Sequence, residues 1–277
     1  MAVVSLGASV LVTGAGGFLG RHLVDVLGRD FSARAFDVQG ESVIKGSVTD
    51  RAALESAMEG VTGLVIGHMA PNRDGIYDDP AVPFDINVKG AALCLQVAAE
   101  LGVKRVVLIS STTVVGRDLA ARRFLSRDLP PSPHGLYALT KTLQEVIARY
   151  YHEEHGMEVA MLRPAYVVSG EDLVDKYGNR KPGADWQAID PRDIAEAASA
   201  ALLLDGLGCE PFYLVAGPEA EAHADIAYTM ERLGWQPRYR FDEFPRQDSQ
   251  TVPGEETRSG ESSGGFYRLN PKRVGNQ

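Results

Sequence analysis

Short apolar runs alternate with amphipathic segments along most of this chain. The first run, 10–12, leads directly into a glycine cluster, and apolar residues then recur at helical spacing over 19–27. This pattern predicts a strand, a tight turn and a helix. The same reasoning predicts further strands at 33–37, 43–46, 105–110, 158–163 and 211–215, and a strand that breaks into a small-residue loop within 63–70. It predicts a capped helix start at 49–54 and helices at 84–101, 136–155, 190–204 and 224–233.

The order of these elements predicts the fold class. Strands keep alternating with helices, which implies right-handed crossovers and an α/β fold, a Rossmann-type doubly wound parallel sheet with a small C-terminal substrate lobe. The segment 105–110 is almost entirely apolar, as expected for the centre of a parallel sheet. The segments 71–83 and 164–189 carry no regular pattern, and we expect them to be irregular and to face the ligand.

Composition narrows the class of protein. The 277 residues suffice for one large α/β domain or for one domain with a small lobe. A net charge of -9 argues against nucleic acid or an anionic membrane as a general partner. Cys94 and Cys209, the two cysteines, have no metal-ligand spacing, so we expect no metal site and a reducing compartment. Because no apolar run is long enough to span a bilayer and the first ten residues do not resemble a signal peptide, we expect a cytoplasmic protein.

The glycine cluster at 13–20 is typical of a turn that binds a dinucleotide. Gly14 permits the turn, Gly17 lets backbone amides approach a pyrophosphate, and Gly20 lets the helix pack closely on the strand. Asp37 follows about 20 residues later, where a carboxylate can accept hydrogen bonds from the adenosine ribose and repel a 2′-phosphate. NAD is therefore favoured over NADP, although Arg34 could accommodate that phosphate. A strand–helix turn without a ligand has the same glycine pattern and remains the alternative.

Tyr137 and Lys141 are four residues apart on a predicted helix and therefore share one face. An ammonium beside a phenol favours the phenolate and lowers the phenol pKa toward the range useful for acid–base catalysis. Ser111 or Thr112, in a hydroxyl cluster at the carboxyl end of the central strand, could hydrogen-bond the same substrate oxygen. An exposed pair on a helix without chemistry is the alternative.

Taken together, these motifs resemble the extended short-chain dehydrogenase/reductase family, the NAD-dependent epimerase/dehydratase group. The resemblance covers roughly residues 10–218 and rests on 13–20, Asp37, Asn87, Ser110, Ser111, 137–141, Arg163, Pro164 and 190–195.

The resemblance implies roles for individual residues. Tyr137 would be the catalytic acid/base, and Lys141 would lower the pKa of Tyr137 and hold the nicotinamide ribose. Ser111 would orient the substrate, with Thr112 as the second choice, and Asn87 would organise backbone and water contacts. A homodimer through the helices that start at Phe84 and Tyr137 is also implied. The residues expected to contact the cofactor are Gly14, Gly16, Gly17, Phe18, Leu19, Asp37, Ser47, Val48, Asn87, Tyr137 and Lys141.

Three positions depart from the family pattern. Ser47 follows the third-strand glycine where an Asp that touches adenine is common, and 68–70 reads His-Met-Ala where two alanines are usual. Val115 precedes Gly116 where a Tyr is common, which removes one wall of the substrate pocket.

The segment between the sixth strand and the helix at 190 predicts the substrate class. Only 25 residues separate Pro164 from Asp190, which is short for holding a nucleotide sugar and resembles the uronate dehydrogenases. We therefore expect a small substrate such as a sugar, a sugar acid or a short aldehyde or ketone. Arg180 or Lys181 could pair with a substrate carboxylate, or both could be solvated loop charges. The candidate substrate-binding residues are Thr112, Thr113, Tyr166, Arg180 and Lys181.

These expectations define one main hypothesis and two alternatives. The main hypothesis is an NAD-dependent oxidoreductase in which a secondary alcohol or hemiacetal gives its proton to Tyr137 and its hydride to nicotinamide. The alternatives are an epimerase or dehydratase with tightly bound NAD and a non-catalytic NAD-sensing protein. We expect a dinucleotide-binding domain at 1–163 and 190–218, a substrate lobe at 164–189 and 219–245, and a polar, flexible tail at 246–277.

Overall fold

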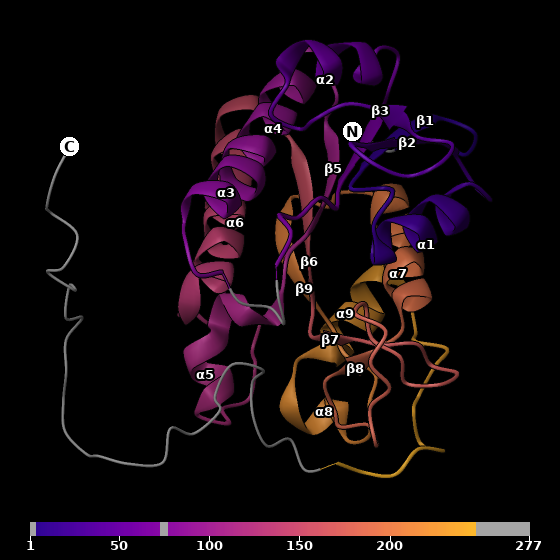
Figure 1. Ribbon diagram of the computed structural model, residues 1–277, viewed down its shortest axis with the longest axis vertical. Helices are drawn as coiled ribbons and strands as arrows, with labels where there is room; N and C mark the ends of the chain where they lie inside the picture. Colours follow the sequence, from indigo (N-terminus) through magenta and orange to yellow (C-terminus); the bar gives the residue numbers. More distant parts are fainter. Residues whose placement is uncertain (1–3, 73–76, 248–277) are drawn as a thin grey trace, which may run out of the picture.

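One parallel sheet organises the computed structural model, which describes residues 4–72 and 77–247. Within these residues the sheet has seven strands in the order β3-β2-β1-β4-β5-β6-β9 (Figure 1). The strands are β1 (Ser9–Thr13), β2 (Ser32–Asp37), β3 (Ile44–Lys45), β4 (Gly63–Ile66), β5 (Arg105–Ile109), β6 (Glu158–Pro164) and β9 (Cys209–Leu214). The fold class and each predicted strand of this sheet are confirmed, with ends that differ by a few residues.

The strand order creates a crevice beside β1. The chain runs outward from β1 through β2 to β3, then returns to place β4 on the other side of β1. Thr13 lies opposite Phe36 on one side and Ile66 on the other, so three strands end at the same edge. The loops that follow them therefore meet at a point where doubly wound sheets bind ligands.

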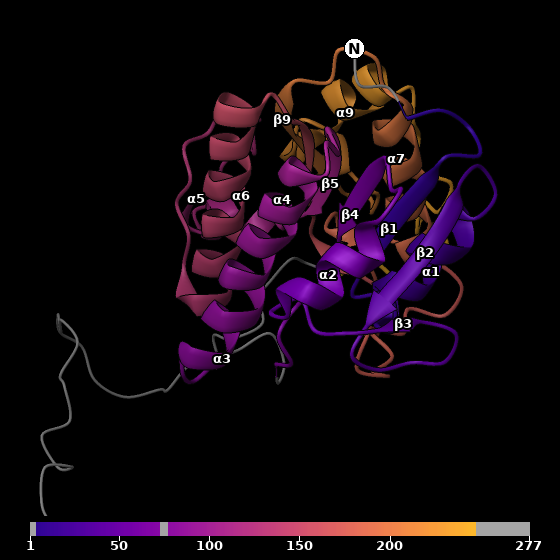
Figure 2. The ribbon, with the colours of Figure 1, turned by 90° about the horizontal axis from the view of Figure 1, so that it is seen from above.

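Helices cover both faces of the sheet. One layer contains α1 (Phe18–Leu27), α7 (Pro191–Leu203) and α9 (Ile226–Leu233), and the other contains α2 (Arg51–Met58), α4 (Gly90–Glu100) and α6 (Gly135–His155) (Figure 2). Val10 and Val12 belong to the hydrophobic core on the first face, and Leu11 belongs to the core on the second. Because successive side chains of a strand point to opposite faces, β1 is apolar throughout.

Local capping explains why several helices begin and end where the sequence predicts. The side chain of Asp50 accepts a hydrogen bond from the Ala53 amide at the start of α2, and Asp190 caps α7 in the same way with Pro191 following it. The helix α6 ends at Gly156, whose left-handed conformation (φ +62°) favours glycine.

The predicted helix over 84–101 is divided in the structure. A short helix α3 (Ala81–Pro83) leads into a π-helical turn, Phe84–Lys89, and regular α-helix α4 begins only at Gly90. The π turn changes the backbone hydrogen bonding, and the Gln144 side chain donates a hydrogen bond to the Asn87 carbonyl (2.8 Å). The predicted helical segment is confirmed to within a residue, but its first turns are π-helical, because apolar periodicity does not record a change of helix type.

Several short elements were not predicted. The segment 164–189, expected to be irregular, contains β7 (Tyr166–Val167) and β8 (Ala188–Ile189), which pair in parallel. A 3-10 turn, Thr112–Val115, and the helices α5 (Gly116–Ala120) and α8 (Ala220–His223) were also missed. Elements of two to five residues are too short to show a hydrophobic period.

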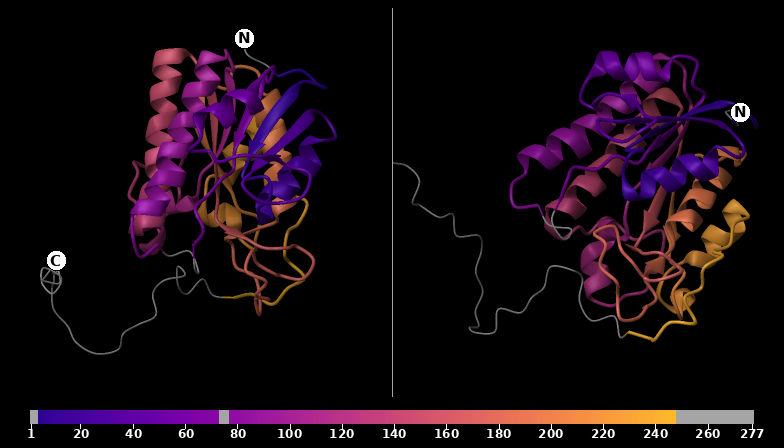
Figure 3. Two further views of the ribbon diagram at one scale, coloured as in Figure 1. Left: turned by 45° about the horizontal axis from the view of Figure 1, so that its top comes forward. Right: turned by 45° about the vertical axis from the view of Figure 1, so that its right-hand side comes forward.

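The segments 164–189 and 219–245 lie side by side at one end of the sheet (Figure 3). The rings of Trp186 and His223 stack with their centres 4.7 Å apart, and the Ala184 amide donates a hydrogen bond to the Pro245 carbonyl (2.9 Å). Both segments share a hydrophobic core with the first face of the sheet. The predicted tail at 246–277 lies outside the described residues from position 248 onward.

Two further features concern the described residues only. None of their helices combines the length and the apolar character needed to cross a lipid bilayer. No group of three or more His, Cys, Asp and Glu side chains in this part of the chain could hold a metal ion.

A buried ion pair fixes α6 to the sheet. The Arg163 guanidinium donates two hydrogen bonds to the Glu145 carboxylate (2.9 and 2.7 Å), and each side chain is only 2% exposed. Ser110 Oγ donates a third hydrogen bond to the same carboxylate (2.6 Å), and Tyr213 Oη accepts one from the guanidinium (3.1 Å). The pair therefore links α6 to β5, β6 and β9.

We expect Glu145→Gln to lower the free energy of unfolding by about 3–5 kcal/mol, because it leaves the Arg163 charge buried without its counter-ion. Urea denaturation at neutral pH measures the loss. The matched control is Glu55→Gln, which breaks an exposed pair with Arg51 on α2 and should cost less than about 1 kcal/mol. Equal losses of unfolding free energy in the two variants would show that the buried pair stabilises the fold no more than the exposed pair.

Candidate active site

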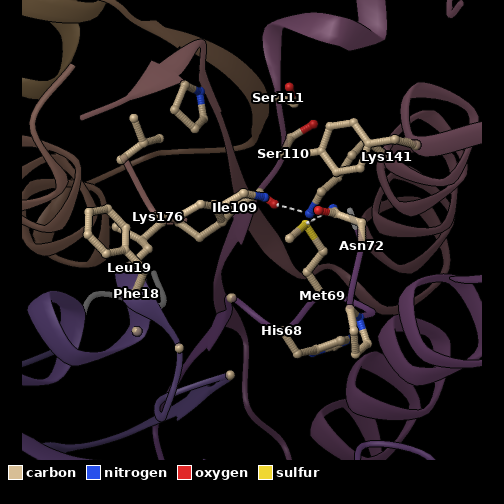
Figure 4. A pocket seen from close by; sticks show the side chains of 18 of the residues that line it. Phe18, Leu19, His68, Met69, Asn72, Ile109, Ser110, Ser111, Lys141 and Lys176 are labelled. Carbon is tan, nitrogen blue, oxygen red and sulfur yellow. Dashed lines mark hydrogen bonds between the residues drawn. The ribbon is translucent and has the colours of Figure 1, made fainter. Parts of the chain in front are cut away.

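A cavity of about 740 Å³ opens at the carboxyl edge of the sheet. The glycine turn after β1, the ends of β2, β4 and β5, and the segment 164–187 all contribute to its lining (Figure 4). This volume lies in the usual range for ligand sites.

The glycine turn shows why each glycine is needed. Gly14 has φ +74°, and a Cβ there would lie 2.6 Å from the His68 backbone, whereas a Cβ on Gly20 would lie 2.0 Å from the Gly14 carbonyl oxygen. Gly17 is different, because a Cβ there would meet only the Gly14 oxygen at 3.3 Å. Packing within the protein therefore does not by itself demand a glycine at 17, and the missing side chain suits close approach by a ligand.

The start of α1 is suited to an anion. Gly17 caps the helix without a side-chain hydrogen bond, and no acidic residue lies in the first turn. The unpaired amides and the positive end of the helix dipole thus point into the cavity, where Phe18 and Leu19 form its wall. The residues present fit the pyrophosphate of a dinucleotide.

The Asp37 carboxylate is held at the end of β2 by two backbone amides. Its oxygens accept hydrogen bonds from Gly16 (2.9 Å) and Gln39 (3.0 Å), and the side chain lines the cavity. Gly16 itself does not line the cavity, so its amide orients Asp37. The Arg34 guanidinium turns away and donates to the carbonyls of Ala57 and Glu59, which leaves it unable to accommodate a 2′-phosphate beside Asp37.

Two other predicted cofactor residues line the cavity, and one does not. Ser47 and Val48 contribute to its wall. Asn87 is fully buried behind it, where its side chain accepts a hydrogen bond from the Ala70 amide (2.7 Å) and donates one to Thr140 Oγ1 (3.0 Å). Asn87 therefore ties the loop after β4 to α6 and acts as a scaffold.

The three predicted catalytic residues come together at one point of the cavity wall. Tyr137 and Lys141 project from α6, and Ser111 follows β5. Lys141 Nζ donates a hydrogen bond to the Ile109 carbonyl (2.7 Å), and the Ser111 hydroxyl is hydrogen-bonded to Tyr137. Thr113 donates two hydrogen bonds to Ser111 Oγ, from its amide (3.2 Å) and its hydroxyl (3.0 Å), which fixes that oxygen.

Burial controls the acid–base properties of this group. Removal from water raises the pKa of Tyr137 to about 12, against the smaller opposite effect of the Ser111 hydrogen bond. Burial, followed by the charge of Lys176, lowers the pKa of Lys141 to about 7. The predicted lowering of the Tyr137 pKa by Lys141 is therefore not found, because the same desolvation acts on both groups.

The loop after β4 also forms part of the wall. His68 Nδ1 is hydrogen-bonded to Thr13 Oγ1 (2.9 Å), and burial lowers the pKa of His68 to about 3, so the ring is neutral. Met69 lines the cavity next to it. His134, before α6, is not part of the lining.

The candidate substrate residues separate into two groups. Thr112, Thr113 and Tyr166 line the cavity, as does Lys181, whose ammonium lies 3.4 Å from the Asp175 carboxylate. Arg180 lies outside the lining, with a side chain 70% exposed and 3.7 Å from Asp172. The structure therefore does not support a contact between Arg180 and a substrate carboxylate.

Sequence reasoning missed several lining residues from the lobe. They come from the segment 164–189 and from the loop after β4, which have no periodic pattern. They are Asn72, Asp175, Lys176, Tyr177, Asn179 and Gln187.

Residues 10–201 match the family described as "NAD dependent epimerase/dehydratase family". This chain belongs to that family. The resemblance proposed from the motifs is thereby confirmed, and the family is one of NAD-dependent enzymes.

Several known proteins are similar to this chain in sequence or fold. L-arabinose 1-dehydrogenase (NAD(P)(+)) of Haloferax volcanii is 24% identical over 251 residues, covering 83% of this chain and 96% of that protein. The crystal structure of uronate dehydrogenase from Agrobacterium tumefaciens aligns with a TM-score of 0.67 at 22% identity, covering 83% of this chain and 84% of that chain. MoeE5, solved with UDP-glucuronic acid and NAD, aligns with a TM-score of 0.70 at 19% identity, covering 83% of this chain and 94% of that chain.

Membership identifies the cofactor of this cavity as NAD, and the geometry agrees. The glycine turn and the start of α1 would hold the pyrophosphate, Asp37 the adenosine ribose, and Lys141 the other ribose.

The low pKa of Lys141 predicts a pH effect on stability. In the unfolded chain a lysine keeps its proton up to about pH 10.4, whereas the folded protein releases this proton at about 7. Between pH 7 and pH 10 the unfolded chain therefore keeps the Lys141 proton that the folded protein has released. The contribution of Lys141 to the free energy of unfolding thus rises steadily with pH over this range. Between pH 7.5 and 9 the wild type should gain about 2 kcal/mol of unfolding free energy relative to Lys141→Met.

Urea denaturation of both proteins at the two pH values measures this difference, in which the other titrating groups cancel. Tyr137 acts only above pH 10, outside this range. A difference that stays constant with pH would mean that Lys141 is charged in the folded protein.

Proposed function

We propose that this protein is an NAD-dependent dehydrogenase that interconverts a secondary alcohol or hemiacetal and a carbonyl on a small, non-nucleotide substrate. The substrate would be a sugar, a sugar acid or a short aldehyde or ketone. The observation that carries the proposal is the meeting of Ser111, Tyr137 and Lys141 in the cavity that also contains the glycine turn and Asp37.

The geometry assigns a role to each of these residues. In the oxidation direction the Tyr137 hydroxyl oxygen, as phenolate, accepts the proton of the substrate hydroxyl, while Ser111 Oγ hydrogen-bonds the same substrate oxygen. NAD, when bound, accepts the hydride. Because the buried phenol resists ionisation, the reaction needs Lys141 in its ammonium form, which stabilises the phenolate by charge. Thr113 keeps Ser111 in place.

We also propose a preference for NAD over NADP. The Asp37 carboxylate faces the cavity, and Arg34 is bound to carbonyls elsewhere. A 2′-phosphate at this position would meet negative charge without a compensating cation.

The two alternatives differ from this proposal in measurable products. An epimerase or dehydratase would return the hydride to its substrate and release no NADH, whereas a sensor would bind NAD without turnover. The intact set of Ser111, Tyr137 and Lys141 argues against a sensor, since binding alone does not need an acid–base group.

We further propose a cytoplasmic homodimer. Leu139, Val146 and Tyr150 form an exposed apolar stripe on α6, with Val146 53% and Tyr150 55% exposed. Such a stripe favours burial against a second copy of the chain, through a four-helix contact of α4 and α6. The free cysteines Cys94 and Cys209 suit a reducing compartment. The division at 1–163 with 190–218 and 164–189 with 219–245 remains part of this proposal.

Turnover tests the chemistry. Wild-type protein is incubated with NAD or NADP and a panel of sugars, uronates, UDP-sugars and short aldehydes, and NADH or NADPH is read by absorbance. With a substrate that responds, Tyr137→Phe should lower kcat by about 10²- to 10⁴-fold while the Kd for NADH changes little, because only the proton acceptor is lost.

Tyr151→Phe is the matched control, since Tyr151 lies on the same helix with its hydroxyl bonded to Gln96, away from the cavity. Full activity of Tyr137→Phe would contradict the proposed chemistry. Epimerised or dehydrated product without net NADH would support the first alternative.

Sedimentation velocity tests the dimer. We expect the wild type to sediment as a dimer and Val146→Asp to shift it to monomer at micromolar concentration, because the charge would be buried in the α6 contact. Val82→Asp, on α3 outside the α6 stripe, is the control and should keep the dimer. A monomeric wild type would refute the homodimer.

A further inference from the structure

One lysine of the lobe, Lys176, lines the cavity but has no role in the proposed proton and hydride transfer. Lys176 follows β7 in the segment that lines the lobe side of the cavity, and Figure 4 shows it across the cavity from Lys141. Its Nζ lies 4.8 Å from the centre of the Tyr177 ring. Among residues 4–72 and 77–247, no carboxylate lies within ion-pair distance of this ammonium.

The carboxylate next to Lys176 in the sequence, that of Asp175, already has hydrogen-bond and ion-pair partners on both oxygens. Asp175 lies 3.4 Å from the Lys181 ammonium and accepts a hydrogen bond from Tyr166 Oη (3.0 Å). Its other oxygen accepts hydrogen bonds from the amides of Tyr177 (2.9 Å) and Asn179 (3.0 Å). Asp175 therefore stabilises the loop and Lys181, and it acts on Lys176 only through its charge, without an ion-pair contact.

Among the residues that the structure describes, the wall opposite Lys176 carries a second lysine and offers no carboxylate that could neutralise the Lys176 ammonium. Lys141 faces the cavity, and Glu145, one turn further along α6, is committed to Arg163. His68 is neutral. Asp37 lies three strands away, at the end of β2, while Lys141 contacts the end of β5.

The lysine is also positioned near the reacting group. Tyr177 and Tyr137 both line the cavity, and the charge of an ionised Tyr177 would raise the pKa of Tyr137. This part of the loop therefore faces the same region of the cavity as the Tyr137 hydroxyl. Tyr177 Oη donates a hydrogen bond to Asn72 Oδ1 (2.5 Å), which connects the lobe loop to the loop after β4 across the cavity. Lys176 is thus held within reach of a substrate bound at Tyr137.

We propose that Lys176 binds an anionic group of the substrate, a carboxylate or a phosphate, so that the substrate is an acidic sugar. The inference rests on the proposed dehydrogenase function and names its substrate class. Displacement of water by the surrounding protein lowers the pKa of both Lys176 and Lys141, so two ammonium groups face one poorly solvated cavity from opposite sides. An anion between them relieves this repulsion and forms a charge-assisted hydrogen bond with Lys176.

Lys176 takes the anion-binding role that the sequence analysis suggested for Arg180 or Lys181. Arg180 is outside the lining, and Lys181 already has Asp175 as its counter-ion. Lys176 is the cation of this segment that lines the cavity and has no counter-ion among the described residues.

Paired substrates test the proposal. Wild type and Lys176→Gln are compared with glucuronate against glucose, and with glucose 6-phosphate against glucose, using NADH formation. We expect Lys176→Gln to lower kcat/KM for the acidic member about 10- to 100-fold and for glucose less than about 3-fold. A loss confined to glucuronate identifies a carboxylate, and a loss confined to glucose 6-phosphate identifies a phosphate.

Two control variants test whether the loss depends on the position of Lys176 or on the removal of any positive charge. Lys104→Gln removes a lysine at the amino end of β5, where Nζ donates to the His155 carbonyl, and should leave both ratios unchanged. Arg180→Gln should also leave them unchanged. A larger effect in Arg180→Gln than in Lys176→Gln would overturn the assignment.

Binding without turnover separates this proposal from the proposed function. Calorimetry measures glucuronate and glucose 6-phosphate binding to Tyr137→Phe with NAD, and to Tyr137→Phe combined with Lys176→Gln. Binding that depends on Lys176 supports the anion site even where no sugar is oxidised. Turnover that Lys176→Gln leaves unchanged keeps the dehydrogenase and refutes the anion site.

Two further results would also refute it. One is that neither acidic probe binds. The other is that Lys176→Gln weakens NADH binding as much as it weakens the acidic substrate, since the lysine would then serve the cofactor.

Discussion

A carboxylate and a guanidinium, both removed from water, hold helix α6 on the sheet. Glu145 and Arg163 form two hydrogen bonds, Ser110 donates another to the carboxylate, and Tyr213 accepts another from the guanidinium. Such a pair tolerates little displacement, because each charge would lose its only compensation in a low-dielectric interior. Since Lys141 lies one turn before Glu145 on α6, the ion pair also sets where Lys141 and Tyr137 meet Ser111.

The same low dielectric that makes the ion pair rigid shapes the chemistry of the cavity. Burial disfavours the charged forms of Tyr137 and Lys141 alike, raising one pKa and lowering the other. A neutral phenol can donate a proton to a carbonyl, but accepting the proton of an alcohol requires the phenolate, which a nearby positive charge must stabilise. The cavity is therefore a site whose acid–base state depends on what enters it, and an anionic substrate would favour the ammonium form of Lys141.

The two sides of the cavity are built from different kinds of structure, which suits them to different ligands. The cofactor side consists of strand ends and a helix start, where backbone geometry fixes Gly14, Gly17 and Asp37. The substrate side consists of loops stabilised by side chains such as Asp175 and Tyr177. Changes on the loop side leave the sheet intact, so the family can keep one cofactor and vary its substrates.

The sequence by itself determined the sheet, the glycine turn and the trio of Ser111, Tyr137 and Lys141, because period-2 and period-3.6 patterns and fixed local spacings encode them. Tertiary structure alone decided the rest. It turned Arg34 away from Asp37, used the Gly16 amide to hold Asp37 and placed Asn87 behind the cavity wall. It also paired Lys181 with Asp175 and left Lys176 without an ion pair to any carboxylate of residues 4–72 and 77–247. These outcomes depend on which partners an aperiodic loop or a long side chain meets in space, and on how much water the fold removes from around them, and neither quantity is written in local sequence.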